Sequence, residues 1–167
     1  MKKFLLFVAA LAVSAAAFAG NAKKQQKLDA DTESFRYDIE YVKTVGDGIS
    51  SVKVWSFSKK PELALKQCRK NAVHGVIFKG YTGTGSSHAA LAKSPTAWQD
   101  HADYFTQFFA EGGEWQRYVA KADASTAETV LVGKKECKVG EVVQVNVKAL
   151  RQALEKAGVI KGLSFGF

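Results

Sequence analysis

The most informative pattern of apolar and polar positions runs from Lys59 to Gly80 and predicts a helix followed directly by a strand. Pro61 suits the first position of a helix. The apolar side chains then recur at helical spacing and the basic ones fall on the opposite side; they are Ala64, Leu65, Cys68 and Ala72 against Lys66, Arg69 and Lys70. We expect Gly75 to end this helix in the left-handed conformation, and residues 76–79 to form an interior strand.

Strict alternation before this helix predicts a β-hairpin. Apolar residues alternate with charged ones at Phe35, Tyr37, Ile39 and Tyr41, which is typical of a half-buried strand. The stretch Gly46-Asp47-Gly48 supplies a turn. A second strand follows, with its apolar residues at Val52, Val54, Trp55 and Phe57. The helix after it is expected to pack across this hairpin.

Aromatic residues dominate the middle of the chain. Ser94 and Pro95 predict the start of a second helix, with serine as its cap. Trp98, His101, Ala102, Phe105 and Phe109 recur at steps of three and four residues. Gly112 and Gly113 interrupt this helix, and a helical segment is expected again over residues 114–120. Aromatic residues at this spacing fit either core packing or a ligand groove.

The C-terminal third predicts another hairpin and a last helix. Two strands, residues 129–137 and 141–147, are expected to turn at Lys138-Val139-Gly140. Asn146 can cap the following helix, which Gly158 ends. Its apolar stripe is Leu150, Ala153, Leu154 and Ala157. The tail after this helix, residues 159–167, is expected to add a short last strand.

Together these elements predict one α+β domain over residues 35–167. We expect a mainly antiparallel sheet of about five strands, with three to four helices packed mostly on one face.

The N-terminus has the pattern of a cleaved bacterial signal peptide. Lys2 and Lys3 precede an apolar stretch, and Ala17-Phe18-Ala19 forms a small-x-small cleavage site. Cleavage is expected after Ala19, which predicts a periplasmic or secreted protein. Residues 20–34 are polar and without periodicity, so we interpret them as a flexible lead-in. The apolar stretch is shorter than a membrane span requires, and no later segment approaches that length.

The charge balance indicates which partners are expected. The chain has a net charge of +8. Without Lys2 and Lys3 it has 22 basic and 16 acidic residues, which favours an anionic polymer or an acidic envelope protein as partner. Nucleic acid is not expected, because an exported protein rarely meets it. The alternative is a solvated basic surface with no partner.

Cys68 and Cys137 permit two interpretations. An even number of cysteines in an oxidising compartment fits a disulfide, which would close a loop of about 70 residues and contribute roughly 4 kcal/mol. The alternative is two buried thiols that act as small apolar residues.

No motif for catalysis, a metal or a cofactor stands out. The glycine-rich stretch from Gly80 to Ser87 lacks the features of a phosphate-binding or dinucleotide-binding loop, so we interpret it as a mobile surface loop. His74 is interpreted as a cation at a helix end. His101 has no second histidine at i+4, as a helical metal site would require. No cofactor is therefore expected.

Three stretches carry a resemblance to a known family: KVWSFSKKPELALKQCRKNAVHGVIFKG, FFAEGGEWQRYV and VGKKECKVGEVVQVNVKALRQALEKAGVIKGL. Through them, residues 37–167 resemble an uncharacterised family of small exported proteins of Bacteroides-type bacteria, a resemblance that implies no activity. More distantly, the alternation of hairpin, helix and strand is similar to the α+β modules of flagellar-assembly and related envelope lipoproteins. The chain departs from those modules because it lacks a lipidation cysteine.

The leading functional hypothesis is a non-enzymatic binding or assembly module of the cell envelope. Its expected partner surface consists of the aromatic helix and the loop over residues 80–88, namely Tyr81, His88, Trp98, Phe105, Phe109 and Trp115. Two other hypotheses are an envelope hydrolase with a site near Ser86, Ser87 and His88, and a structural subunit.

Overall fold

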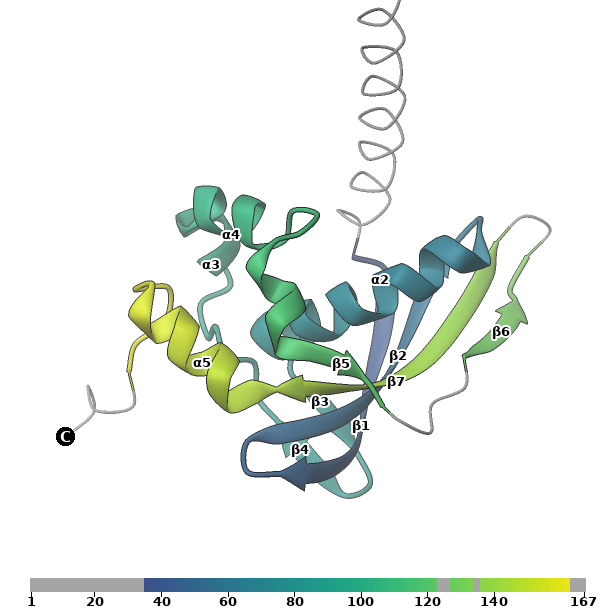
Figure 1. Cartoon of the computed structure of the whole chain (residues 1–167), viewed down its shortest axis with the longest axis horizontal. Helices are drawn as coiled ribbons and strands as arrows, with labels where there is room; N and C mark the ends of the chain where they lie inside the picture. The colour runs from purple at the N-terminus through teal and green to yellow at the C-terminus, as the bar shows by residue number, and fades with distance from the viewer. Residues whose placement is uncertain (1–34, 123–126, 134–135, 163–167) are drawn as a thin grey trace, which may run out of the picture. The chain divides into compact units, whose positions relative to one another are not determined.

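The computed structural model describes residues 35–122, 127–133 and 136–162 (Figure 1). Apart from Phe35, these residues belong to one compact unit, residues 36–167. The predicted signal peptide, residues 1–19, and the lead-in, residues 20–34, lie outside the described residues. Residues 159–162 of the tail form no strand, and the rest of the predicted last strand also lies outside them. In the part that the structure describes, no helix is long and apolar enough to cross a membrane.

The unit has the α+β class that the sequence predicts, built on a mostly antiparallel open sheet. The described strands are β1 (Tyr37–Gly46), β2 (Ile49–Ser58), β3 (Tyr81–Gly83), β4 (Ser86–His88), β5 (Val119–Lys121), β6 (Glu128–Leu131) and β7 (Cys137–Asn146). Their order is β4-β3-β1-β2-β7-β5, and β6 pairs with the other half of the same edge of β7. The pairing of β1 with β3 is parallel.

The described helices are α2 (Pro61–His74), α3 (Ala97–Asp100), α4 (Ala102–Phe108) and α5 (Val147–Lys156). A π-helical turn, Gly75–Lys79, continues α2, and a 3-10 helix, Glu114–Tyr118, precedes β5. The sequence pattern predicts about five strands, whereas the described part of the chain has seven. The reason is length: β3, β4 and β5 have three residues each, too few to show a period of two.

The structure confirms the N-terminal hairpin that the alternation predicts. β1 and β2 pair antiparallel around Asp47 and Gly48, and Gly48 has the positive φ of 75° that a tight turn requires. Val52 and Val54 are fully buried on one face of β2. Trp55 and Phe57 are half-buried on the other face, because successive side chains of a strand alternate.

The predicted strand after α2 is wrong. Residues 75–79 continue the helix as a π-helical turn, and Gly75 has ordinary right-handed angles. The left-handed residue is Gly80, with φ 72°, whose N–H donates to the carbonyl of Gly75 at 2.9 Å. Successive positions of this segment, Val76 and Ile77, are both apolar because the turn itself is buried. A short apolar run has the same pattern in a buried strand and a buried helix end.

Gly75 is needed for close packing and not for chain reversal. A β-carbon added there would lie 2.8 Å from Cδ1 of Ile39 and 3.3 Å from Cε2 of Tyr37. The glycine therefore lets the end of α2 approach β1.

The aromatic helix is broken where one helix was predicted. α3 ends at Asp100 and α4 begins at Ala102, with His101 at φ −128° and ψ 37° between them. Ser94 is not the helix cap; its hydroxyl accepts from the Thr96 N–H at 3.3 Å, ahead of α3. Residues 114–120, also predicted as helix, divide into the 3-10 helix and the start of β5.

The C-terminal elements are partly as predicted. The turn at Lys138-Val139-Gly140 is wrong, because these residues lie inside β7, which pairs with β2 along its whole length. The helix prediction is confirmed: the Asn146 side chain accepts from the Ala149 N–H at 2.9 Å, and Gly158 follows α5 with φ 72°. Leu150 and Leu154 on its stripe are fully buried.

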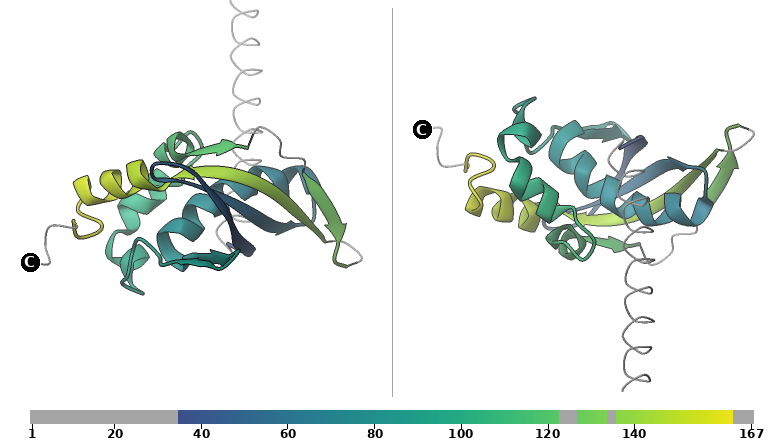
Figure 2. Two further views of the ribbon diagram at one scale, coloured as in Figure 1. Left: turned by 90° about the horizontal axis from the view of Figure 1, so that it is seen from below. Right: turned by 90° about the horizontal axis from the view of Figure 1, so that it is seen from above.

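α2 is the helix that packs extensively against the sheet, chiefly on β2 and β7. It lies in front of the strands in the view from above and behind them in the view from below (Figure 2). α3 and α4 instead contact the end of α2 and the π-helical turn through aromatic rings. The structure therefore does not reproduce the predicted packing of most helices directly on one sheet face. The reason is that α3 and α4 pack through aromatic rings on the end of α2 and the π-helical turn.

The glycine-rich stretch is a β-hairpin and not a loop without regular structure. β3 and β4 pair antiparallel, with Thr84 and Gly85 at positive φ in the turn. A β-carbon on Gly83 would lie 2.4 Å from the carbonyl oxygen of Tyr41. These glycines therefore serve a tight turn and close strand packing.

Candidate functional site

The predicted partner surface divides into separate groups. Trp98, Phe105 and Phe109 join an aromatic cluster at the end of α2, which consists of Tyr37, His74, Phe78, Trp98, Phe105 and Phe109. Tyr81 and His88 belong to a second group on β1, β3 and β4. The indole N–H of Trp115 donates to the carbonyl of Ala110 at 3.0 Å.

Burial shows that part of the predicted surface is core. Phe105 is fully buried, Phe109 is 3% exposed and Tyr81 is 5% exposed. Trp98, Trp115 and His88 are half-buried. Of the two interpretations of the aromatic helix, Phe105 and Phe109 therefore fit core packing.

His74 lies at the centre of the aromatic cluster. Its ring centroid is between 4.8 and 6.0 Å from those of Tyr37, Phe78, Trp98 and Phe109. Its Nδ1 atom is 2.6 Å from the Tyr37 hydroxyl oxygen. Burial, and then the charges of Lys79 and Lys70, lower the pKa of His74 to about 3. The side chain is therefore neutral at physiological pH, and its interpretation as a helix-end cation is wrong.

His88 stacks on Tyr81 and lies at a tilt against Tyr41, and the two tyrosine rings also stack on each other. Its ring centroid is 4.7 Å from both Tyr41 and Tyr81, and the plane of Tyr81 is within 13° of its own. Its Nε2 atom is buried without a hydrogen-bond partner, whereas Ser86 and Ser87 are exposed. A serine hydrolase needs a base within hydrogen-bond reach of the nucleophile, and this hairpin does not present such a pair.

The two cysteines are free, buried thiols. The Cys68 thiol donates to the carbonyls of Val139 at 3.3 Å and Val54 at 3.5 Å, and the Cys137 thiol donates to that of Ser58 at 3.0 Å. Burial raises the pKa of Cys68 to about 11, so its thiolate is scarce at neutral pH. The structure matches the interpretation as two buried thiols, and the predicted disulfide is not formed.

A buried carboxylate lies next to Cys68 beneath α2. Glu141 is on the inner face of β7 and is 2% exposed, with Oε2 lacking a hydrogen-bond partner. The Nε of Arg69 is 3.8 Å from it. Burial raises the pKa of Glu141, whereas the charges of Arg69 and Lys121 lower it. Glu141 is therefore the buried partner of an ion pair with the exposed Arg69, and not an isolated acid.

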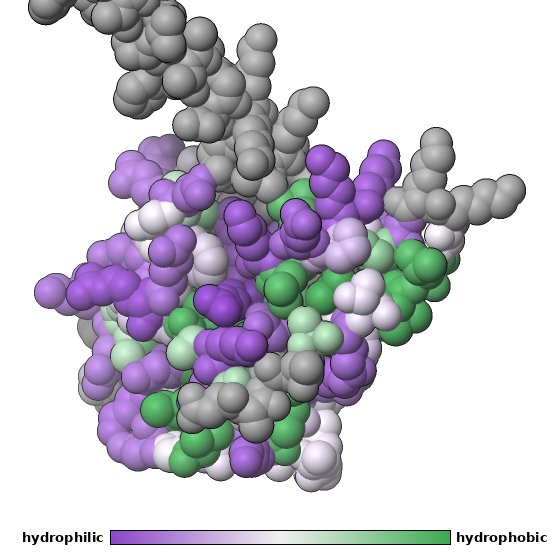
Figure 3. All heavy atoms as spheres, turned by 45° about the vertical axis from the view of Figure 1, so that its right-hand side comes forward, coloured by the Kyte–Doolittle hydropathy of each residue, from purple (hydrophilic) through white to green (hydrophobic). Residues whose placement is uncertain are grey.

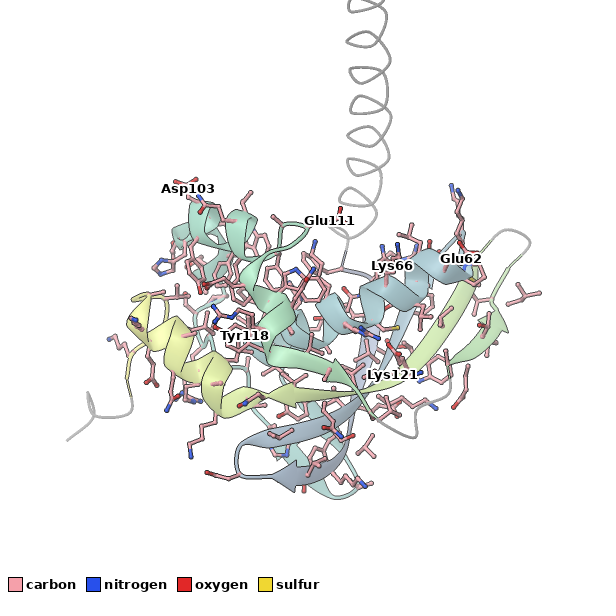
Figure 4. The ribbon with its side chains drawn as sticks, viewed as in Figure 1. Glu62, Lys66, Asp103, Glu111, Tyr118 and Lys121 are labelled. Atoms are coloured by element: carbon pink, nitrogen blue, oxygen red, sulfur yellow. The ribbon has the colours of Figure 1, made fainter. Side chains whose placement is uncertain are left out.

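Basic side chains of the neighbouring elements α2 and β5 form one surface, which we call the cationic surface: Lys66, Arg69 and Lys70 of α2 together with Lys121 of β5. Lys121 points toward α2 because it pairs with Val143, whose side chain is on the inner face. Lys66, Arg69 and Lys121 are exposed. Figure 4 labels Lys66 and Lys121 on these neighbouring elements. Two of these four cations, Arg69 and Lys121, act on the buried carboxylate of Glu141.

The sequence contained a signal for part of this site. Glu141 shares its parity with Val143 and Val145, which alternate with Gln144 and Asn146, so the alternation along this strand could have placed it inside. Lys121 had no such signal, because β5 is too short to predict. Among the described residues, no three His, Cys, Asp or Glu side chains lie close enough together to hold a metal ion.

Comparison with known proteins gives no relative: no family model, no curated protein and no solved structure matches this chain.

Proposed function

We propose that this protein is an exported, non-enzymatic binding module of the cell envelope that contacts an anionic partner through the cationic surface. The observation that carries the proposal is that two exposed cations on neighbouring elements, Arg69 of α2 and Lys121 of β5, both act on the buried Glu141. Lys66 and Lys70 lie within one turn of Arg69 on the same helix. Charges of one sign on one surface attract a partner of the opposite sign and accelerate its association.

Export is part of the proposal. It is supported by the signal-peptide pattern of residues 1–19 and by the resemblance of residues 37–167 to a family of small exported proteins. In the envelope, an anionic polymer or an acidic protein has the charge that this surface attracts.

The position of the cations, and not only the net charge of +8, is what the proposal requires. Other exposed lysines, such as Lys43 and Lys156, lie on β1 and α5. A protein that owed its affinity to net charge alone would use all of these lysines equally.

The test is retention on an immobilised sulfated polysaccharide, used as a general polyanion. We expect the double variant Lys66→Gln/Lys121→Gln to elute at clearly lower salt than the unmodified protein. The control Lys43→Gln/Lys156→Gln removes the same charge elsewhere and should shift elution much less. Equal shifts for the two double variants would refute a localised anion-binding surface.

A further inference from the structure

Strand β6 leaves one edge of the sheet open and apolar. In the described residues, the large apolar side chains that are strongly exposed are Val45, Val130, Leu131 and Val132, at 46%, 47%, 80% and 46%. Three of these four are consecutive and lie on or directly after β6. Figure 3 shows apolar side chains gathered on the side of the molecule where β6 lies.

The hydrogen-bond register identifies which backbone groups face outward. The Val132 N–H donates to the Glu136 carbonyl at 3.1 Å, so this pair is hydrogen-bonded across the β6–β7 ladder. Because such pairs alternate in an antiparallel ladder, Val130 and Glu128 also bond to β7. The N–H and C=O groups of Thr129 and Leu131 therefore point away from β7, toward the open edge.

This edge lacks the protection that edge strands usually have. Proteins commonly block such edges with lysine, proline or a bulge. β6 has one charged residue, Glu128, and its carboxylate is held by Lys53 at 2.8 Å on the same chain. At the opposite end of the sheet, β4 is only three residues long, and its two serines are exposed and polar.

We propose that β6 pairs antiparallel with β6 of a second copy of this chain, which makes one continuous sheet across a two-fold axis. In this register Val130 lies opposite Val130 of the other copy. Thr129 of each copy then lies opposite Leu131 of the other, which makes two such pairs. Each of these two pairs can exchange two backbone hydrogen bonds. Glu128 then faces Val132, so the contact opposes no like charges.

A second copy fits this edge because the strand is complementary to itself. An isologous two-fold contact needs the same surface to satisfy itself. The outward donors and acceptors of Thr129 and Leu131 do so, and the exposed side chain of Val130 lies against Val130 of the other copy. The charged residue of β6, Glu128, is already paired with Lys53, so the strand carries no free charge that would favour a partner of opposite charge.

The contact is short, so the dimer is expected to be weak. Stable specific interfaces bury roughly 1,200 to 2,000 Å², and a strand of this length covers less. The dimer should therefore dissociate on dilution. It would also place two cationic surfaces in one particle, which raises avidity for a repeating anionic partner.

The test is the mass of the purified protein by sedimentation over a roughly hundredfold range of concentration. We expect the mass to rise from one chain toward two. In Val130→Lys, two added lysines would meet at the two-fold axis, and the protein should remain monomeric. The matched control is Val45→Lys, with the same added charge at an equally exposed valine on β1; this variant should still dimerise.

A second variant separates pairing through the backbone from contact between side chains. In Leu131→Pro the lost N–H is one that points outward, so the ladder to β7 keeps its hydrogen bonds. It should also stay monomeric, with circular dichroism unchanged. An unmodified protein that is monomeric at every concentration overturns the proposal and leaves the edge to a strand from another protein. Dimerisation that persists in Val130→Lys also overturns it.

Discussion

The hydroxyl oxygen of Tyr37 lies 2.6 Å from Nδ1 of His74, which ties the start of β1 to the last turn of α2 inside the aromatic cluster. This contact holds a neutral histidine among aromatic rings. It explains why the end of the helix is a packing centre and not a solvated, charged terminus.

The first prediction concerns acid stability. The pKa of His74 is lowered from 6.5 to about 3 in the folded chain. A group with a lowered folded pKa binds its proton more readily when unfolded, so its contribution is complete above pH 6.5 and is lost as the pH falls toward 3. We expect the free energy of unfolding to drop by a few kcal/mol over this range, on the order given by the shift. Urea unfolding at a series of pH values measures it, with His74→Gln as the comparison that should show a smaller drop. A His74 ring signal that titrates near pH 6.5 in the folded protein would contradict this expectation.

The second prediction concerns the thiols. Because the pKa of Cys68 is about 11, its thiolate at pH 8 is roughly a hundredfold scarcer than that of an ordinary thiol, and burial slows its reaction further. The folded chain should therefore react very slowly with iodoacetamide. In denaturant without reductant, mass spectrometry should find both Cys68 and Cys137 alkylated. A denatured chain that takes up no reagent would mean that the cysteines are bonded to each other.

The third prediction concerns the buried carboxylate. Burial raises the pKa of Glu141 in the folded chain. The charged carboxylate therefore lowers the free energy of unfolding, and this loss is complete above the raised pKa. Glu141→Gln should increase the free energy of unfolding at neutral pH, because it removes the buried charge. The advantage should shrink as the pH falls through the raised pKa toward the ordinary value. Glu111→Gln, which removes one negative charge at an exposed position, is the control in the same urea titrations. A destabilised Glu141→Gln would mean that the ion pair with Arg69 outweighs burial.

The fourth prediction concerns Gly75. In Gly75→Ala the new β-carbon would lie 2.8 Å from Cδ1 of Ile39 and 3.3 Å from Cε2 of Tyr37, so these side chains or the helix end must shift, at a cost of about 1 kcal/mol. At Gly46 a β-carbon would have nothing within 4 Å. Gly46→Ala should therefore change stability by no more than about 0.5 kcal/mol. Thermal unfolding of the two variants decides between close packing and chain flexibility as the role of Gly75; equal melting temperatures would exclude close packing.

Local patterns in the sequence were enough to predict the first hairpin, the start of α2 and the whole of α5. Each of these depends on spacing within a few residues: the alternation from Tyr37 to Tyr41, Pro61 at a helix start, and Asn146 as a cap. The α+β class followed from these elements. The basic side of α2, with Lys66 and Arg69, was also visible as a stripe.

The tertiary structure decided what depends on contacts between distant segments. The run Val76 to Phe78 forms a helical turn in which Val76 and Ile77 are buried, and an apolar run alone does not distinguish that from a strand. Gly75 is small because β1 lies against it, and Lys121 joins the cationic surface because β5 pairs with β7. Sequence periodicity reports which side of an element is buried. It does not report which other element buries it, and that choice fixes both the core and the surface left for a partner.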